Sequence, residues 1–259
     1  MKKIKVLNLY AGIGGNRKLW KNVDVTAVEI DEKIANIYKS FFPEDEVIVG
    51  DAHKFLLDNF SKFDFIWSSP PCPTHSSFKK IWMKTGKQKI VYPDMGLYQE
   101  ILLLQHFFKG KWVVENVNGY YEPLIKPQEA GRHYFWSNFN IENIKMPKLD
   151  IRYGKTGGEG YGFDLNGKNY GDKRKLLRNC VDPKLGLHIF ESAYKEDKQK
   201  LLSVSPTSQT SPNGDFSKEK EHNISLKESS SEDSQISSND ETSLNNNIKS
   251  NSAFCLPTL

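Results

Sequence analysis

The chain has 259 residues, of which 37% are hydrophobic, enough for one sizeable folded domain. Its three cysteines have no paired spacing, which excludes a disulfide-stabilised scaffold, and no apolar stretch approaches the roughly 18 residues of a membrane-spanning helix. The N-terminus leads straight into a strand-like run, so we expect a soluble, cytoplasmic protein with reduced thiols and no membrane partner.

Composition and charge divide the chain in two. Residues 203–259 are rich in Ser and Asn, contain eight acidic residues and four lysines, and have a net charge of −4. Such a segment buries too little apolar surface to offset the entropy of ordering, so it is predicted to be disordered. Because the whole chain has a net charge of +4, residues 1–202 carry +8. A folded part this basic favours a polyanionic partner, although a lysine-rich solvated surface would have the same charge.

Apolar runs alternate with helical patterns through the first half of the chain. Strands are expected at residues 3–10, 25–30, 47–51, 63–71 and 111–117, and helices at residues 31–42 and 96–108. This alternation predicts an α/β fold with a mostly parallel sheet flanked by helices. In such sheets ligands bind at the carboxyl ends of the strands.

Unusual residues stand at the carboxyl end of each expected strand. They are Tyr10, Gly12, Gly14 and Gly15 after the first strand, Glu29 and Asp31 after the second, Asp51 after the third, Cys72 after the fourth and Glu115 at the end of the fifth. Because the carboxyl ends of parallel strands meet at one edge of a sheet, we expect these groups to share one site.

The first three strand ends have the features of an adenosine site. The glycines of YAGIGG allow a tight turn and a close approach of ligand to backbone. Glu29 stands where a carboxylate accepts hydrogen bonds from ribose hydroxyls, and Asp51 could accept one from the adenine amine. Alternatively, Glu29 neighbours a helix cap and Asp51 caps the next helix. The loop lacks G-x-G-x-x-G and the lysine of a triphosphate site, so S-adenosylmethionine, which has no phosphate, fits better.

Cys72 follows the fourth strand inside the stretch SSPPCP. Prolines on both sides stiffen the loop and fix the direction of the sulfur. A thiolate is a natural nucleophile toward a soft, conjugated carbon; a purely structural Pro-Pro-Cys is the alternative. Cys72 and His75 have the spacing of half a metal site, but no second pair lies in the folded part, so no metal is expected. A Cys–His hydrolase dyad would leave the adenosine-type groups unexplained.

The stretches LNLYAGIGG, VEID, GDAH, SSPPCP, ENV and RNCV, in this order, resemble the successive motifs of the DNA cytosine-5 methyltransferases of bacterial and phage type. The resemblance covers about residues 4–190. It implies a Rossmann-like S-adenosylmethionine-dependent methyltransferase fold and methyl transfer to C5 of cytosine. It also implies that Cys72 attacks cytosine C6, that Glu115 holds N3 and the exocyclic amine, and that Arg132 contacts O2. Asn116 would buttress the cysteine loop.

The resemblance also implies a set of S-adenosylmethionine contacts. These are Tyr10, Ala11, Gly12, Gly14, Gly15, Glu29, Ile30, Asp51, Ala52, Pro70, Leu97 and Asn179. The chain departs from the family at several places: Tyr10 stands where Phe is usual, Pro73 where Gln is usual, and Arg178 where Gly is usual. Arg132 stands without the second arginine of the family's R-x-R pair.

The region that would recognise the target is short. Family members insert many tens of residues between the arginine and asparagine motifs, whereas about 40 residues separate Trp136 from Asn179 here. We therefore expect four parts: a catalytic S-adenosylmethionine-binding domain at residues 1–139, a short target-recognition region at 140–175, a C-terminal helix returning to the catalytic domain at 176–202, and the disordered tail at 203–259. Lysines and tyrosines in the recognition region suit phosphate contacts and base stacking.

The expected partner is double-stranded DNA, from which the target base must be extruded. The polar segment at residues 74–89, with five lysines and interleaved aromatic residues, could close over that base, or could be a merely solvated loop. The protein is expected to be monomeric, in a bacterial or phage-infected host, and an unknown protein partner could complete the recognition region. Two alternatives stay open: the same chemistry on transfer RNA, and a catalytically silent DNA-binding relative.

Overall fold

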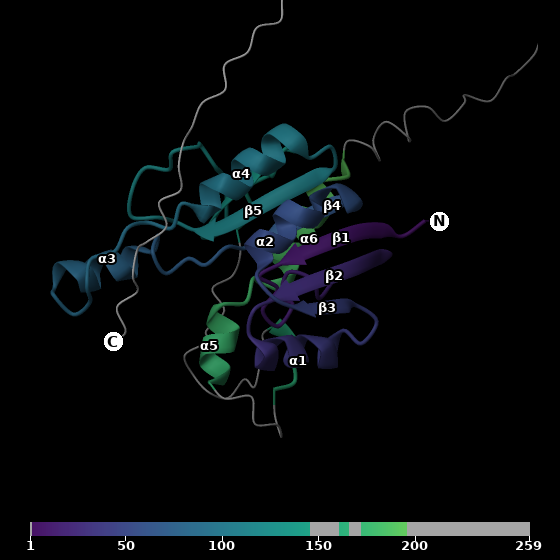
Figure 1. The fold of residues 1–259 in the computed structure, drawn as a ribbon, viewed down its shortest axis with the longest axis horizontal. Coiled ribbons are helices and arrows are strands. Elements are labelled where there is room, and N and C mark those ends of the chain that lie inside the picture. Colours follow the sequence, from purple (N-terminus) through teal and green to yellow (C-terminus); the bar gives the residue numbers. More distant parts are fainter. Residues whose placement is uncertain (1, 146–160, 166–171, 196–259) are drawn as a thin grey trace, which may run out of the picture. The chain divides into compact units, whose positions relative to one another are not determined.

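A computed structural model describes residues 2–145, 161–165 and 172–195 (Figure 1). The chain divides into two units, Met1–Thr207 and Ser208–Leu259, and every described residue belongs to the first. The predicted tail, and residues 146–160 and 166–171 of the predicted recognition region, lie outside the described residues. No helix in the described ranges is long and apolar enough to cross a membrane.

Seven strands form one sheet in the order β3-β2-β1-β4-β5-β7-β6. Their bounds are β1 Ile4–Leu9, β2 Val23–Glu29, β3 Glu46–Val49, β4 Phe65–Ser68, β5 Lys111–Val117, β6 Gln128–Ala130 and β7 His133–Ser137. The first five strands pair in parallel, and β7 runs antiparallel to both β5 and β6. The predicted mostly parallel sheet is therefore confirmed, with an antiparallel hairpin at one edge.

Both faces of the sheet are covered by helices, as a parallel sheet requires. The helices are α1 Glu32–Phe41, α2 Ala52–Asn59, α3 Ser77–Lys84, α4 Gly96–Phe107, α5 Lys173–Arg178 and α6 Pro183–Ser192, with a 3₁₀ turn at Phe60–Lys62. Leu7 and Leu9 of β1 pack with α2 and α4. Val6, on the opposite face because side chains alternate along a strand, packs with α6. Ala27 of β2 packs with Tyr38 of α1.

The C-terminal return differs from the expected single helix at residues 176–202. The structure has two short helices, α5 and α6, separated at residues 179–182. Pro183 explains the break, since it has no N–H to continue α5 and suits the first turn of α6. Gly186 lies against the backbone of Asn16, and the Trp20 indole donates to the Gly186 carbonyl at 3.1 Å, so α6 is held tightly on the sheet.

Helix α3 is a second difference, because the segment around it was expected to be a polar loop. Residues 77–84 contain no Gly or Pro, so nothing in this stretch interrupts a helix. In Figure 1, α3 projects from the side of the sheet toward which the arrowheads of β1, β2 and β5 point.

Candidate active site

The loop after β1 turns sharply beneath the carboxyl ends of the strands. Tyr10, Gly12 and Gly14 have φ angles of 55°, 55° and 83°, in the left-handed region that glycine adopts readily and tyrosine does not. The Gly12 N–H donates to Glu29 Oε2 at 2.9 Å. A Cβ added at Gly12 would meet no atom within 4 Å, so this backbone is open to a ligand.

The other two glycines of the loop serve packing. A Cβ at Gly14 would overlap the rings of Phe42 and Tyr38, and a Cβ at Gly15 would overlap Cys180 Sγ and the Val181 carbonyl. Both were predicted to contact the cofactor. Packing against the end of α1 and against the residues after α5 explains why neither carries a side chain, and contact of their backbone with the cofactor stays a prediction.

Replacing Gly15 with alanine should lower the free energy of unfolding by about 1–3 kcal/mol, because the new methyl group overlaps Cys180 Sγ and a backbone carbonyl that cannot move freely. Thermal unfolding measures this. Gly50→Ala is the matched control, since a Cβ there meets nothing within 4 Å. An equal loss in both variants would contradict the close packing of Gly15.

Glu29 ends β2 and joins two loops. Its side chain is 8% exposed; Oε2 accepts from Gly12 N, and Oε1 accepts from Asp31 N at 3.0 Å. Each carboxylate oxygen has a second lone pair that these bonds leave unused. Asp31, and not Glu29, caps α1, through bonds from Lys33 N and Ile34 N. Glu29 therefore lies next to the residue that caps α1, as the alternative interpretation expected. Its carboxylate is also held beside Gly12, where it can accept hydrogen bonds from a ligand.

Asp51 caps α2, as the alternative interpretation expected, with Oδ1 accepting from Lys54 N at 3.2 Å. It is exposed at the end of β3. Ile30 beside Glu29 is 73% exposed, so its side chain is available to cover a ligand. Ala52 and Leu97 are buried in the cluster that includes Leu9, so they support the site from below.

The basic residues after the glycines are already engaged. Both guanidinium nitrogens Nε and Nη2 of Arg17 donate to the Asp45 carboxylate at 2.9 Å. Lys18 Nζ lies 4.1 Å from the centre of the Phe163 ring, and burial lowers its pKa. Both cations are thus bound to groups of the protein itself and do not form a phosphate-binding site. An open backbone at Gly12 and unused acceptor capacity at Glu29 suit the phosphate-free adenosine of S-adenosylmethionine.

The cysteine loop after β4 is pinned to the end of β5. The Asn116 amide donates to the Pro70 carbonyl at 3.0 Å, which confirms its predicted buttressing position. The Cys72 carbonyl accepts from His75 N and Ser76 N, and Tyr120 N donates to the His75 carbonyl. These bonds hold the loop without use of the Cys72 thiol.

His75 is buried against the β5–β6 connection. Its Nδ1 lies 2.6 Å from the Tyr121 hydroxyl, and burial lowers its pKa, so the neutral imidazole is favoured. Among the described residues, no group of three or more His, Cys, Asp or Glu side chains could hold a metal ion. His75 therefore stabilises the loop that carries Cys72.

Cys72, in the loop after β4, interacts electrostatically with Glu115 of β5. The pKa of the half-buried Cys72 thiol is raised, first by burial and then by the negative charge of Glu115. Glu115 is 7% exposed. Because burial and a like charge both disfavour the thiolate, the free protein keeps this sulfur protonated at neutral pH.

Alkylation of Cys72 should shift to lower pH in Glu115→Gln. The amide removes the negative charge that opposes the thiolate and leaves the burial unchanged. Iodoacetamide labelling followed by mass spectrometry across pH 7–10 would measure the midpoint. Cys180 should stay unlabelled, because burial raises its pKa to about 12. An unchanged midpoint in Glu115→Gln would mean that the two groups do not interact.

The structure does not bring Arg132 to Glu115. Arg132 is exposed in the β6–β7 turn, after Gly131 with a φ of 64°. His133 approaches instead, with Nε2 3.7 Å from Glu115 Oε1. Pairing of Val117 with His133 places His133 diagonally across from Glu115. Sequence reasoning missed His133; a register assignment for this hairpin would have found it.

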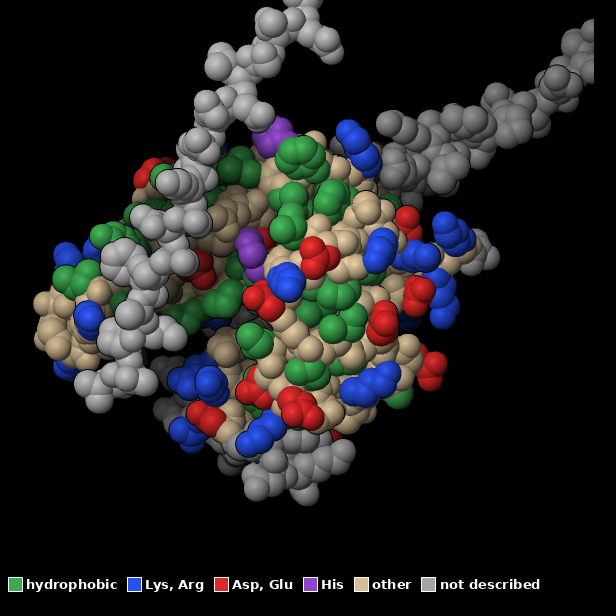
Figure 2. All heavy atoms as spheres, viewed as in Figure 1, with side chains coloured by type: hydrophobic (Ala, Val, Ile, Leu, Met, Phe, Trp, Pro, Cys, Tyr) green, Lys and Arg blue, Asp and Glu red, His purple; other side chains and the backbone are tan. Residues whose placement is uncertain are grey.

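Asn179 is exposed at the end of α5, next to Cys180, which packs on Gly15. The RNCV stretch therefore packs against the glycine loop, and the contact of Asn179 with the cofactor stays a prediction. Figure 2 shows Lys and Arg side chains gathered around the projecting α3 and again near α5. On α3, Ile81 and Trp82 are exposed between lysines.

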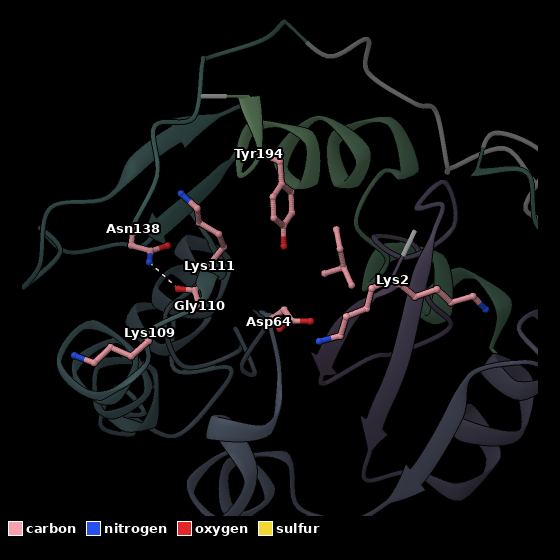
Figure 3. Close-up of a pocket in the computed structure, with 9 residues that line it drawn as sticks. Lys2, Asp64, Lys109, Gly110, Lys111, Asn138 and Tyr194 are labelled. Carbon is pink, nitrogen blue, oxygen red and sulfur yellow. Dashed lines mark hydrogen bonds between the residues drawn. The ribbon is translucent and has the colours of Figure 1, made fainter. Parts of the chain in front are cut away.

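A hollow of about 480 Å³ lies at the opposite edge of the sheet (Figure 3). Its lining residues are Lys2, Lys3, Ile4, Asp64, Lys109, Gly110, Lys111, Asn138 and Tyr194. Ile4 and Lys111 begin β1 and β5, so this hollow faces the amino ends of the strands and is separate from the candidate site.

The mostly parallel sheet with helices on both faces is the predicted Rossmann-like fold of the S-adenosylmethionine-dependent methyltransferases. Residues 4–124 match the model of the C-5 cytosine-specific DNA methylases. Over these residues the chain is similar to that family, as its sequence motifs predicted, and this similarity supports S-adenosylmethionine as the methyl donor.

Two curated relatives are methyltransferases by name. Type II methyltransferase M.HgiCII of Herpetosiphon aurantiacus is 24% identical over 218 residues, which are 81% of this chain and 45% of the relative. Orphan methyltransferase M.SPBetaI of Bacillus phage SPbeta is 34% identical over 82 residues, 29% of this chain and 18% of the relative. The chain thus spans less than half the length of either relative.

Solved structures overlap this chain in part. DNMT2 of Spodoptera frugiperda is 25% identical with a TM-score of 0.33, covering 46% of this chain and 37% of that one. An S-adenosylmethionine-dependent methyltransferase of Agrobacterium tumefaciens is 17% identical with a TM-score of 0.32, covering 46% and 40%.

Proposed function

We propose that this chain transfers a methyl group from S-adenosylmethionine to C5 of cytosine in double-stranded DNA, through a covalent bond between Cys72 and C6 of an extruded base. The observation that best supports this is the electrostatic interaction of Cys72, in the loop after β4, with Glu115 of β5; β4 lies between β5 and β1, the strand that leads into the open glycine loop. A nucleophile, an acid and an adenosine site at one edge are the parts this reaction needs.

Each of the two residues has a defined task in this proposal. Cys72 loses its thiol proton to solvent and Sγ then adds to C6, which moves negative charge toward C5 and N3 of the ring. Glu115, as a carboxylic acid, donates a proton to N3 and stabilises that charge. S-adenosylmethionine, when bound, supplies an electrophilic methyl group at a sulfonium centre. Once C5 has taken this methyl group, it loses its proton to solvent, the Cys72 sulfur leaves C6 as a thiolate, and N3 returns its proton to the Glu115 carboxylate, which restores the aromatic ring.

The remaining predicted residues are assigned to binding. Gly12, Glu29 and Asp51 would hold the cofactor, with Ile30 across the adenine. Arg132 would reach cytosine O2 from the β6–β7 turn. The lysines around α3 would contact phosphates, since they surround exposed Ile81 and Trp82 near the nucleophile loop.

Transfer of tritium from labelled S-adenosylmethionine tests the reaction and its substrate together. The purified chain is incubated with duplex DNA of mixed sequence, or with transfer RNA, and the bases are separated. Label in 5-methylcytosine from DNA is expected. Label only in RNA would replace the DNA assignment, and no label despite measurable cofactor binding would indicate a catalytically silent nucleic-acid-binding protein.

A further inference from the structure

Glu100, on α4, is a buried carboxylate to which the proposed reaction gives no task. It is 1% exposed, yet three donors reach it. Its Oε1 accepts from the Tyr10 hydroxyl at 2.6 Å and lies 3.0 Å from His53 Nδ1, and its Oε2 accepts from the Ser68 hydroxyl. A buried charge needs such partners, because leaving it unpaired would cost several kcal/mol.

The three donors come from three different strand ends. Tyr10 opens the glycine loop after β1, and Ser68 ends β4, four residues before Cys72. His53 lies in the first turn of α2, two residues after Asp51. One carboxylate therefore connects the glycine loop, the cysteine loop and the start of α2, which together surround the proposed cofactor site.

Of the three residues, Tyr10 depends most on its hydrogen bond to Glu100. Its φ of 55° is unfavourable for a residue with a Cβ, by about 1–2 kcal/mol, so the surrounding structure must hold it. The pKa of Tyr10 is raised far above its usual range by burial and by the Glu100 charge, so the hydroxyl stays protonated and donates. The bond to Glu100 fixes the ring next to the open backbone of Gly12.

We propose that Glu100 is a positioning residue that preforms the cofactor site by fixing Tyr10 and Ser68 on one buried carboxylate. This inference rests on the proposed function, because it takes S-adenosylmethionine to be the molecule bound there. Glu100 itself touches neither cofactor nor base. It acts through Tyr10 and Ser68. Its removal should therefore lower the affinity for the cofactor and leave the affinity for DNA unchanged.

The test is a double-mutant cycle on cofactor binding with Glu100→Gln, Tyr10→Phe and the combined variant. Isothermal titration measures S-adenosylmethionine affinity, and a fluorescent duplex measures DNA affinity. Glu100→Gln should weaken cofactor binding about tenfold or more, the loss of one charge-assisted hydrogen bond, with DNA affinity unchanged. Tyr10→Phe should add little in the Glu100→Gln background, because the bond it removes is already weakened.

Glu191→Gln is the matched control. Glu191 is exposed on α6, and the same change there should leave both affinities as in the wild type. Unchanged cofactor affinity in Glu100→Gln, fully additive losses in the cycle, or a parallel loss of DNA binding that follows lowered thermal stability would each overturn the positioning role. Wild-type protein that binds no S-adenosylmethionine would instead overturn the proposed function.

Discussion

Replacing Cys72 with serine is expected to abolish methyl transfer to cytosine while S-adenosylmethionine binding persists. A hydroxyl is a far weaker nucleophile than a thiolate toward a conjugated carbon, and no other cysteine among the described residues lies beside Glu115. Tritium transfer to duplex DNA measures the first effect and isothermal titration the second. We expect activity at background level.

A trapped complex separates the nucleophile from other causes of inactivity. Duplex DNA with 5-fluorocytosine has no proton at C5 to lose after methylation, so the bond between Cys72 and C6 cannot break. The wild type and Cys255→Ser should form a DNA adduct that survives denaturing electrophoresis, and Cys72→Ser should not. An adduct with Cys72→Ser, or one mapped by mass spectrometry to another residue, would remove Cys72 from this role.

Glu115→Gln is expected to lower the single-turnover rate of methyl transfer by roughly 10²–10⁴-fold, the usual contribution of a positioned acid. The glutamine amide keeps the size of the side chain and can still contact the base, but it has no acidic proton to give to N3. The loss should therefore fall on kcat more than on KM for DNA. Rapid-quench measurements with enzyme in excess over DNA isolate this step.

The lowered thiol pKa expected in this variant helps the interpretation. Glu115→Gln should make Cys72 more reactive toward iodoacetamide and less active toward cytosine, two effects of opposite direction from one substitution. A rate within threefold of the wild type would contradict proton donation by Glu115. Glu191→Gln is the same substitution at an exposed position on α6. This control should have the wild-type rate of methyl transfer.

The parallel part of the fold was predictable because its information is local. Each strand from β1 to β5 is a short apolar run followed by a helix, and parallel strands deliver their carboxyl ends to one edge. The placement of Glu29, Asp51, Cys72 and Glu115 follows from that rule. The rule did not decide between the alternative roles of these residues. That Asp51 caps α2 is shown only by the geometry at the start of the helix.

Contacts between distant segments were beyond sequence reasoning. The approach of His133 to Glu115 depends on the register of β7 against β5, which one residue of slip would reverse. In the sequence, Glu100 is a polar residue within the mostly apolar helix GLYQEILLL, and nothing marks it as buried. Its hydrogen bond to Tyr10 depends on the packing of α4 against β1. The roles of Gly14 and Gly15 likewise depend on their neighbours across the fold.

The return of the chain to its core has a consequence for how much the length of the chain after β7 can vary. Ile141 packs in the core beyond β7, and Tyr161, Phe163 and Leu165 pack again before α5 begins. The chain between Ile144 and Tyr161 is therefore anchored at both ends by buried side chains. The entropy of closing such a segment rises only slowly with its length. The number of residues between these two anchors can therefore change while the buried side chains on either side keep their packing.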